Sequence, residues 1–219
     1  MKAVIFDLDG VIVSTDEFHF EGWKRMAEGE GIYFDREINE RLRGVSRMES
    51  LQIILEKSEK PYGMEEKDGL ATKKNGYYRE LLNNLTEKDI LPGVMNILAS
   101  LKYKGIKIAI GSSSKNTPVI LEKIKLNHYF DAIADGNEIK NSKPDPEVFL
   151  LAAEKLGISP SDCVVVEDAH AGIEAAIAAG MKAVGIGFAS NSPKAHYKVK
   201  DLSIISIDEM LKDQNGLER

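Results

Sequence analysis

The chain has 219 residues, of which 43% are hydrophobic and 29% are charged, and its formal net charge is −6. A chain of this length and apolar content can bury a folded core, which excludes a disordered protein. The negative charge argues against general binding to nucleic acid or to an acidic membrane surface. Cys163 is the only cysteine, which excludes an intrachain disulfide. We expect a cytoplasmic, monomeric protein in which this thiol is buried.

The first apolar run predicts a strand over residues 2–6, and Asp7 ends it. This run is too short for the core of a signal peptide or for a membrane span. Residues 16–80 then show helical patterns and no convincing strand, which predicts a helical insertion after the first strand. Within it, Ser46 and Glu49 have the spacing of a capping box. The apolar positions expected to pack in that helix are Met48, Leu51, Ile54 and Leu55.

Short β-rich runs alternate with helical patterns after residue 90. Asp145, Pro146 and Glu147 form the start signal of one helix, and Gly157 ends it. An alanine-rich helix is expected over residues 170–179. This alternation predicts an α/β fold: a Rossmann-like parallel sheet with helices on both faces. The strands expected after the insertion are residues 106–110, 132–134, 163–166, 183–186 and 203–205.

Two pairs of acidic residues end strands of the predicted sheet. Asp7 and Asp9 follow the first strand, and Glu167 and Asp168 follow the strand at 163–166. The carboxyl ends of parallel strands share one edge, where oxygen ligands in such numbers suit Mg²⁺. A calcium-binding EF-hand is excluded because the apolar residues 11–13 replace the further oxygen ligands that it needs. For the second pair, simple capping of the following helix stays open as an alternative.

Groups suited to phosphate occur in two further segments. Residues 112–116 supply three serines, Lys115 and Asn116 after a predicted strand, and Ser142 and Lys143 precede a predicted helix. Hydroxyl, amide and ammonium groups bind phosphate oxygens. A loop rich in Ser and Lys is often only a solvated turn, but its expected place at the acidic edge favours phosphate binding.

Together these segments resemble the four motifs of the haloacid dehalogenase-like phosphotransferases. The matching residues, in family order and spread over nearly the whole chain, are Asp7, Asp9, Gly10 and Val11, then Ser112, then Lys143 and Pro144, then Glu167 and Asp168. The insertion is similar to the small helical cap of one subgroup. The resemblance implies a core domain of residues 1–14 and 88–219 and a cap domain of residues 15–87.

The resemblance also implies the chemistry of the core. Asp7 is expected to become an aspartyl phosphate, and Asp9 is expected to act as general acid and base. Ser112 and Lys143 are expected to stabilise the transferring phosphoryl group. The implied ligands of a Mg²⁺ cofactor are the carboxylates of Asp7, Glu167 and Asp168 and the main-chain carbonyl of Asp9.

The cap residues resemble those of a mutase that handles a sugar bisphosphate. Thr15 and His19 are expected to take part in catalysis, with Lys74 helping His19 to position Asp9. A second phosphate is expected between Arg47 on the cap and Ser114, Lys115 and Asn116 on the core. The remaining substrate-binding positions implied are Trp23, Gly44, Val45, Ser46 and Ser50.

Structural interpretations of three cap residues stay open. Arg47 has Glu49 and Glu56 as alternative partners on its own helix. His19 has a structural alternative, and Trp23 is as compatible with packing as with lining a pocket. Two further positions depart from the mutase pattern: Ser14 replaces an acidic hinge residue, and Ala169 replaces a hydroxyl residue.

The implied reaction converts β-D-glucose 1-phosphate into glucose 6-phosphate, with β-glucose 1,6-bisphosphate as intermediate and phosphodonor. The expected partner is therefore a small phosphorylated sugar. The alternative is a capped sugar-phosphate or phosphoglycolate phosphatase, which admits water to the aspartyl phosphate where a mutase excludes it. A third, non-catalytic interpretation is a response-regulator-like module phosphorylated on aspartate. The helical insertion and the second set of phosphate-binding groups argue against it.

Overall fold

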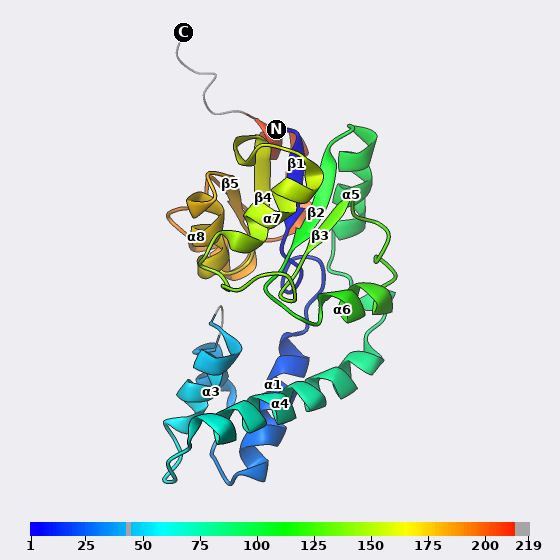
Figure 1. The fold of residues 1–219 in the computed structure, drawn as a ribbon. Coiled ribbons are helices and arrows are strands. Elements are labelled where there is room, and N and C mark those ends of the chain that lie inside the picture. The colour runs from blue at the N-terminus through cyan, green and yellow to red at the C-terminus, as the bar shows by residue number, and fades with distance from the viewer. Residues whose placement is uncertain (43–44, 213–219) are drawn as a thin grey trace. The chain divides into compact units, whose positions relative to one another are not determined.

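The computed structural model describes residues 1–42 and 45–212. Its contacts divide the chain into two compact units, and Figure 1 traces the elements of each. The core unit consists of Met1–Ser14 and the chain from Thr86 onward, and the helical unit consists of Thr15–Leu85. The helical unit is therefore an insertion into the core unit after the first strand.

One parallel sheet of six strands forms the centre of the core unit, in the order β3-β2-β1-β4-β5-β6. Phe6 on β1 lies beside Ile110 on β2 and beside Val166 on β4. The central strands are apolar and buried on both faces, as in sheets covered by helices. The strands are β1 Ala3–Phe6, β2 Lys107–Gly111, β3 Ala132–Ala134, β4 Cys163–Glu167, β5 Lys182–Gly185 and β6 Tyr197–Lys198.

Helices cover both faces of this sheet, as predicted (Figure 1). α7 and α8 contact each other and share one apolar cluster with Ile5 and Val165. α5 contacts β2, but its buried residues lie outside that cluster, which places α5 on the other face. The helices of the core unit are α5 Val94–Tyr103, α6 Thr117–Lys123, α7 Glu147–Leu156, α8 His170–Ala178 and α9 Ile207–Leu211.

The strand order reverses between β1 and β4. After β1 the chain adds β2 and β3 on one side, and then returns to place β4 on the other side. The amide of Asp7 donates to the carbonyl of Val166 at 3.0 Å, so the pairing of β1 with β4 continues to the carboxyl ends of both strands. In open α/β sheets this reversal point is where ligands bind.

The two segments that lead into and out of the helical unit are paired within the core unit. Val13 forms an antiparallel bridge with Ile90. The amide of Leu91 donates to the carbonyl of Ile12 at 2.9 Å. The chain therefore enters and leaves the helical unit from one short antiparallel pair of segments, the paired ladder of residues 12–13 and 90–91.

α7 begins and ends where the sequence predicts, although Pro146 and not Asp145 is the N-cap residue. Asp145 Oδ1 accepts a hydrogen bond from the amide of Glu147 at 2.9 Å. At the other end, Gly157 takes up a left-handed conformation with φ of 66°, which a residue with a side chain adopts less readily. The alanine-rich helix is also present, as α8.

The strand predicted at residues 203–205 is wrong. Residues Leu202–Ile204 instead form a 3-10 helix, η5. Asp201 precedes this helix, and its Oδ1 accepts a hydrogen bond from the amide of Ser203 at 2.9 Å. A local side-chain cap therefore overrides the β propensity of the isoleucines, and the sixth strand is the short β6.

The helical unit has its own apolar core. α4 packs along α1 and also contacts α3. Ser46 begins α3, and its Oγ accepts the amide of Glu49 at 3.3 Å, which is one of the two bonds of the predicted capping box. Leu51, Ile54 and Leu55 are buried as predicted, whereas Met48 is 43% exposed because it lies one turn before the part of α3 that joins the core. The helices are α1 Asp16–Gly29, α2 Arg36–Glu40, α3 Arg47–Leu55 and α4 Met64–Leu81.

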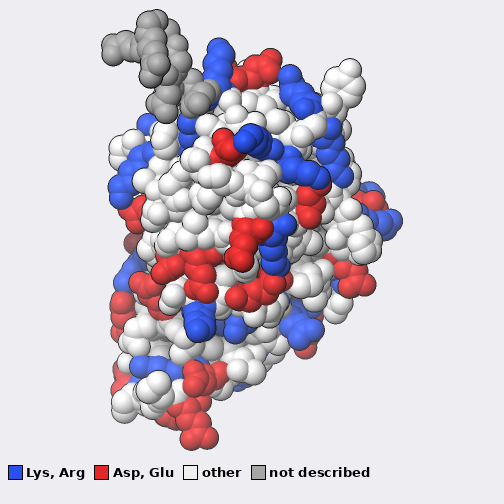
Figure 2. All heavy atoms as spheres, turned by 45° about the horizontal axis from the view of Figure 1, so that its top comes forward, with Lys and Arg blue, Asp and Glu red and all other residues white. Residues whose placement is uncertain are grey.

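Basic and acidic side chains are mixed on the surface. Lys and Arg alternate with Asp and Glu over the face drawn in Figure 2. The sequence has 29 basic and 35 acidic residues, so the excess of negative charge is small. An anion site must therefore come from a local group of residues. Within residues 1–42 and 45–212, no helix is long and apolar enough to span a membrane.

Candidate active site

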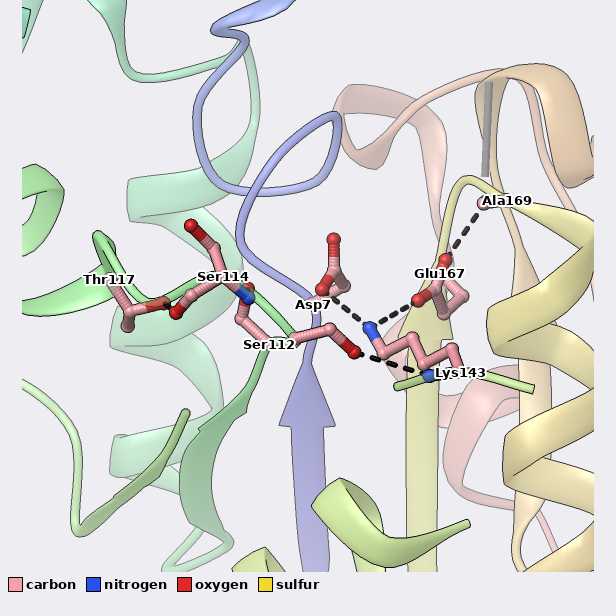
Figure 3. A network of polar contacts seen from close by, with 8 residues as sticks. Asp7, Ser112, Ser114, Thr117, Lys143, Glu167 and Ala169 are labelled. Atoms are coloured by element: carbon pink, nitrogen blue, oxygen red, sulfur yellow. Dashed lines mark hydrogen bonds and ion pairs between the residues drawn. The ribbon is translucent and has the colours of Figure 1, made fainter. Parts of the chain in front are cut away.

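A buried lysine joins the ends of the two central strands. Lys143 Nζ lies 2.6 Å from Asp7 Oδ1, after β1, and 2.6 Å from Glu167 Oε1, at the end of β4 (Figure 3). The side chains of Lys143, Asp7 and Glu167 are 10%, 11% and 1% exposed. The fold thus gathers three predicted site residues from segments that are far apart in the sequence.

Charge pairing determines the state of Lys143. Burial alone lowers the pKa of this ammonium group, but the carboxylates of Asp7 and Glu167 outweigh burial and raise the pKa above its ordinary value. For Glu167, burial raises the carboxyl pKa and the charge of Lys143 opposes that rise. The other Glu167 oxygen, Oε2, accepts the amide of Ala169 at 2.9 Å. Lys143 is therefore a cation held in a fixed position beside Asp7.

Asp168 completes an acidic cluster at the same place. One carboxylate oxygen from each of Asp7, Glu167 and Asp168 lies within 4.8 Å of the other two. Gly10, with φ of +81°, lies so close that a Cβ atom there would be 2.2 Å from Asp168 Oδ2. A glycine is therefore required where the first motif meets the last. Three carboxylates at this spacing are hard oxygen donors, and they fit a Mg²⁺ ion.

Asp9 lies in the turn between Asp7 and the paired ladder. It is half-buried, and its backbone bridges to Val13. The amide of Gly10 donates to the carbonyl of Val13 at 2.7 Å, which closes the turn. The role of Asp9 as acid and base stays a prediction.

A loop that begins at Ser112, after β2, reaches the same edge of the sheet. Ser112 is 3% exposed, and its Oγ accepts the amide of Ser114 at 3.3 Å. Ser114 Oγ in turn accepts the amide of Asn116 at 3.2 Å, and its carbonyl accepts Thr117 Oγ1 at 2.9 Å (Figure 3). Asn116 is buried, whereas Lys115 is exposed. The loop is therefore shaped by its own hydroxyl groups.

Ser113 connects this loop to the buried lysine. Its Oγ accepts a hydrogen bond from the amide of Lys143 at 3.3 Å. Sequence reasoning missed this residue, because no pattern distinguishes it from the serines on either side. This hydrogen bond therefore connects the loop that begins at Ser112 with the segment that contains Lys143.

The helical unit contains a second group of buried polar side chains. Lys74 Nζ lies 2.7 Å from His19 Nδ1 and 4.9 Å from the centre of the Trp23 ring. An ammonium group has no acceptor, so Lys74 donates and His19 is neutral with its proton on Nε2. Burial holds the pKa of His19 well below its ordinary value, and the charges of Lys74 and Arg47 lower it further.

Tyr78 joins Thr15 to this group. The hydroxyl of Tyr78 lies 2.8 Å from Thr15 Oγ1, and its ring centre lies 4.2 Å from that of His19. Lys74 Nζ is 4.8 Å from the same tyrosine ring. Sequence reasoning missed Tyr78, although its position four residues after Lys74 on α4 is a helical neighbour spacing that signals contact.

The cap alternatives can now be compared with observed contacts. Arg47 Nη2 donates to Asn75 Oδ1 at 3.1 Å, and Glu56 pairs with Arg41 instead. Trp23 is 3% exposed and belongs to the apolar core of the helical unit, so it packs there. Its contact with the Lys74 ammonium group makes it part of the polar cluster as well.

The other predicted cap positions cluster at the start of α3. Val45 is half-buried, Ser46 is the N-cap residue, and Ser50 is 4% exposed. Gly44 lies outside the described residues. The structure therefore places three of these four positions within the first turns of one helix.

The fold and the acidic site match a known family. Residues 1–180 fit the model of the haloacid dehalogenase-like hydrolases, and the chain belongs to this family. It is 47% identical over 210 residues to the beta-phosphoglucomutase of Bacillus subtilis, covering 95% of this chain and 93% of that protein. It is 34% identical to the phosphorylated carbohydrates phosphatase of Thermotoga maritima, covering 96% and 97% of the two chains. The crystal structure of beta-phosphoglucomutase from Clostridium difficile has a TM-score of 0.87 and 42% identity, covering 96% of this chain and 95% of that one.

Proposed function

We propose that the protein is a Mg²⁺-dependent β-phosphoglucomutase that converts β-D-glucose 1-phosphate into glucose 6-phosphate. The observation that carries this proposal is the buried Lys143, paired with Asp7 and Glu167 beside a metal-compatible acidic cluster. The 47% identity to a beta-phosphoglucomutase over nearly the whole chain supports the choice of reaction. The intermediate is β-glucose 1,6-bisphosphate, which also serves as phosphodonor.

The reaction consists of two phosphoryl transfers through Asp7. Aspartyl phosphate first donates its phosphoryl group to the 6-hydroxyl of β-glucose 1-phosphate, and Asp9 takes the hydroxyl proton. The bisphosphate then presents its other phosphate, and an oxygen of Asp7 forms a bond to phosphorus while the bond to the sugar oxygen breaks. Asp9 returns the proton to that oxygen. Glucose 6-phosphate leaves, and the phosphorylated enzyme is restored.

Charge repulsion is the main barrier that the site must lower. A carboxylate and a phosphoryl oxygen at about 4 Å repel by roughly 4 kcal/mol at an effective dielectric constant near 20. Lys143 offsets this repulsion because its ammonium group is fixed 2.6 Å from Asp7. The hydroxyl of Ser112 donates a hydrogen bond to the transferring group. A Mg²⁺ ion bound by Asp7, Glu167, Asp168 and the carbonyl of Asp9 would supply further positive charge.

The helical unit is the proposed cap. Its neutral His19, its buried Lys74 and Arg47 form a polar group with positive charge, which suits an anionic sugar phosphate. Thr15, at the start of this unit, is fixed by Tyr78. We assign Thr15 and His19 to catalysis. The substrate-binding positions of this unit are Trp23, Gly44, Val45, Ser46, Arg47, Ser50 and Lys74, and we propose that the unit also excludes water.

A sugar-phosphate phosphatase is the second candidate. The 34% identity to a phosphorylated carbohydrates phosphatase favours it specifically. The two candidates share every step up to the aspartyl phosphate and differ in the acceptor, which is a sugar hydroxyl in the mutase and water in the phosphatase. The products therefore distinguish them.

The test supplies β-glucose 1-phosphate, Mg²⁺ and a trace of the bisphosphate. Glucose 6-phosphate and free phosphate are measured in the same reaction. We expect glucose 6-phosphate with little free phosphate, and free phosphate without glucose 6-phosphate would refute the mutase. Asp7→Asn should abolish both products, while Asp208→Asn, at an exposed aspartate of the core unit, should keep activity. Near-normal turnover by Asp9→Asn would refute the acid and base assignment.

A further inference from the structure

A turn that follows β3 continues the sheet pairing into the phosphate-binding loop. The amide of Ser112 donates to the carbonyl of Ala134 at 3.1 Å. Two residues later on each chain segment, the amide of Gly136 donates to the carbonyl of Ser114 at 3.2 Å. The turn 135–137 therefore supports residues 112–115 from the neighbouring strand, beyond the ends of β2 and β3.

Asn137 adds a side-chain contact to this support. Its Nδ2 donates to the carbonyl of Lys115 at 3.1 Å and to Asp135 Oδ1 at 2.9 Å. The backbone amide of Asn137 donates to the same Asp135 oxygen at 2.8 Å. Both partners of Nδ2 are acceptors, so the amide group has one possible orientation. Asp135 is 5% exposed, which makes it a fixed anchor for that orientation.

The turn and the loop are in direct backbone contact at Gly136. A Cβ atom there would lie 2.2 Å from the carbonyl oxygen of Ser113 and 2.9 Å from the amide of Lys115. No side chain fits between the two segments. The shape of the loop at residues 113–115 therefore follows the shape of the turn.

We propose that Asn137 is a positioning residue for the phosphate group that is not being transferred. This inference rests on the proposed mutase function, in which Ser114, Lys115 and Asn116 bind that group. Asn137 holds the Lys115 carbonyl, and with it the segment of main chain that presents the side chains of Lys115 and Asn116. Ser112, which serves the transferring group, is held by other bonds, to Ser114 and Ala134. Loss of Asn137 therefore weakens binding of the phosphate that is not being transferred and leaves binding of the transferring phosphate unchanged.

The test compares a ligand with two phosphates and a ligand with one. In Asn137→Ala, the KM for β-glucose 1,6-bisphosphate in the mutase reaction should rise about fivefold to tenfold, the size of one lost neutral hydrogen bond. The kcat should be unchanged. The KM for acetyl phosphate, which phosphorylates Asp7 without a sugar or a second phosphate, should also be unchanged. A variant with a generally destabilised fold should not raise the KM for the bisphosphate while leaving the KM for acetyl phosphate unchanged.

Two further variants sharpen the result. Asn137→Asp keeps the size of the side chain but replaces the amide donor with a second carboxylate beside Asp135, so its KM for the bisphosphate should rise at least as much. Asn96→Ala removes an exposed asparagine on α5 and should behave as wild type. An unchanged KM for the bisphosphate in Asn137→Ala overturns the proposal, and so does an equal rise in both KM values.

A calorimetric titration separates this proposal from the proposed function. Glucose 6-phosphate is titrated into the wild-type protein and into Asn137→Ala with Mg²⁺ present. If the wild-type protein produces no glucose 6-phosphate in the mutase assay, the mutase function fails. A fivefold to tenfold weaker Kd in the variant would still support the role of Asn137. An equal Kd in the two proteins would contradict it.

Discussion

The core unit and the helical unit each bury a lysine, but they stabilise it by different means. Lys143 in the core unit lies between the carboxylates of Asp7 and Glu167. Lys74 in the helical unit, 2% exposed, contacts the neutral His19 and the faces of two aromatic rings. Two carboxylates contact the first cation directly, whereas the contacts of the second include a neutral ring nitrogen and two aromatic faces. The proposed site of phosphoryl transfer therefore lies at the lysine that two carboxylates hold.

Removal of Lys143 should have the largest effect. Lys143→Ala leaves the buried carboxylates of Asp7 and Glu167 facing each other, so the free energy of unfolding should fall by about 3 kcal/mol or more. Mutase activity should fall about a thousandfold because the charge beside the nucleophile is lost. Urea unfolding and the glucose 6-phosphate assay measure these changes. The control Lys194→Ala removes an exposed ion pair and should change neither quantity strongly.

The stability of Lys143→Ala in the presence of Mg²⁺ is a second test. A divalent cation at the acidic cluster would replace part of the lost positive charge, so Mg²⁺ should stabilise Lys143→Ala more than the wild type. Equal stabilisation of the two proteins would contradict the proposal that Lys143 lies beside the carboxylates that bind Mg²⁺. If Lys143→Ala were as stable as the wild type in the absence of Mg²⁺, the stabilising ion pairs of Lys143 with Asp7 and Glu167 would be contradicted.

Gly10→Ala tests the core site without changing any charge. The new Cβ would lie 2.2 Å from Asp168 Oδ2 and would be strained at φ of +81°, so the carboxylate must move. We expect kcat/KM to fall about a hundredfold and half-maximal activity to need more Mg²⁺. The matched control is Gly69→Ala on α4, where a Cβ meets nothing within 4 Å. It should remain active and gain roughly 0.5–1 kcal/mol of stability.

The smallest expected effect is a pH dependence from the helical unit. The folded-state pKa of His19 is well below its ordinary value of about 6.5, so its contribution to stability is complete above that pH. Below about pH 6.5 the unfolded chain takes up a proton that the folded protein does not. The free energy of unfolding should then decline by up to about 1.4 kcal/mol per pH unit.

Urea unfolding between pH 7 and pH 5 measures this decline. His19→Gln should show a shallower slope, because the residue that differs between folded and unfolded states is gone. The exposed His128 supplies the control substitution, His128→Gln, which should keep the wild-type slope. An identical slope in all three proteins would mean that folding does not lower the pKa of His19.

Much of the core site follows from the sequence because a parallel sheet brings strand ends to one edge. The patterns around Asp7, Ser112 and Glu167 each predict a strand followed by polar residues, and the order of the strands then makes them neighbours. The sequence predicts Lys143 in a loop before a helix. Its ion-pair partners, Asp7 and Glu167, become evident only from the folded structure. The family resemblance names the roles, which no periodicity provides.

Contacts made to the backbone are the part that sequence patterns do not reveal. Ser113 accepts the amide of Lys143, and Asn137 donates to the carbonyl of Lys115. Every residue supplies such a carbonyl, and every residue except proline supplies such an amide, so no pairing of side-chain types marks these contacts. The same reason explains the wrong strand at residues 203–205, where Asp201 bonds to the amide of a neighbouring residue.

The paired ladder of Val13 with Ile90 makes the helical unit exchangeable. Antiparallel neighbours in such a bridge lie only about 5 Å apart, so a tight turn of a few residues could close the gap that the inserted helices now occupy. Evolution can therefore lengthen, shorten or replace the insertion without altering the register of the sheet. A single phosphoryl-transfer scaffold can in this way acquire new substrates by changing the inserted segment.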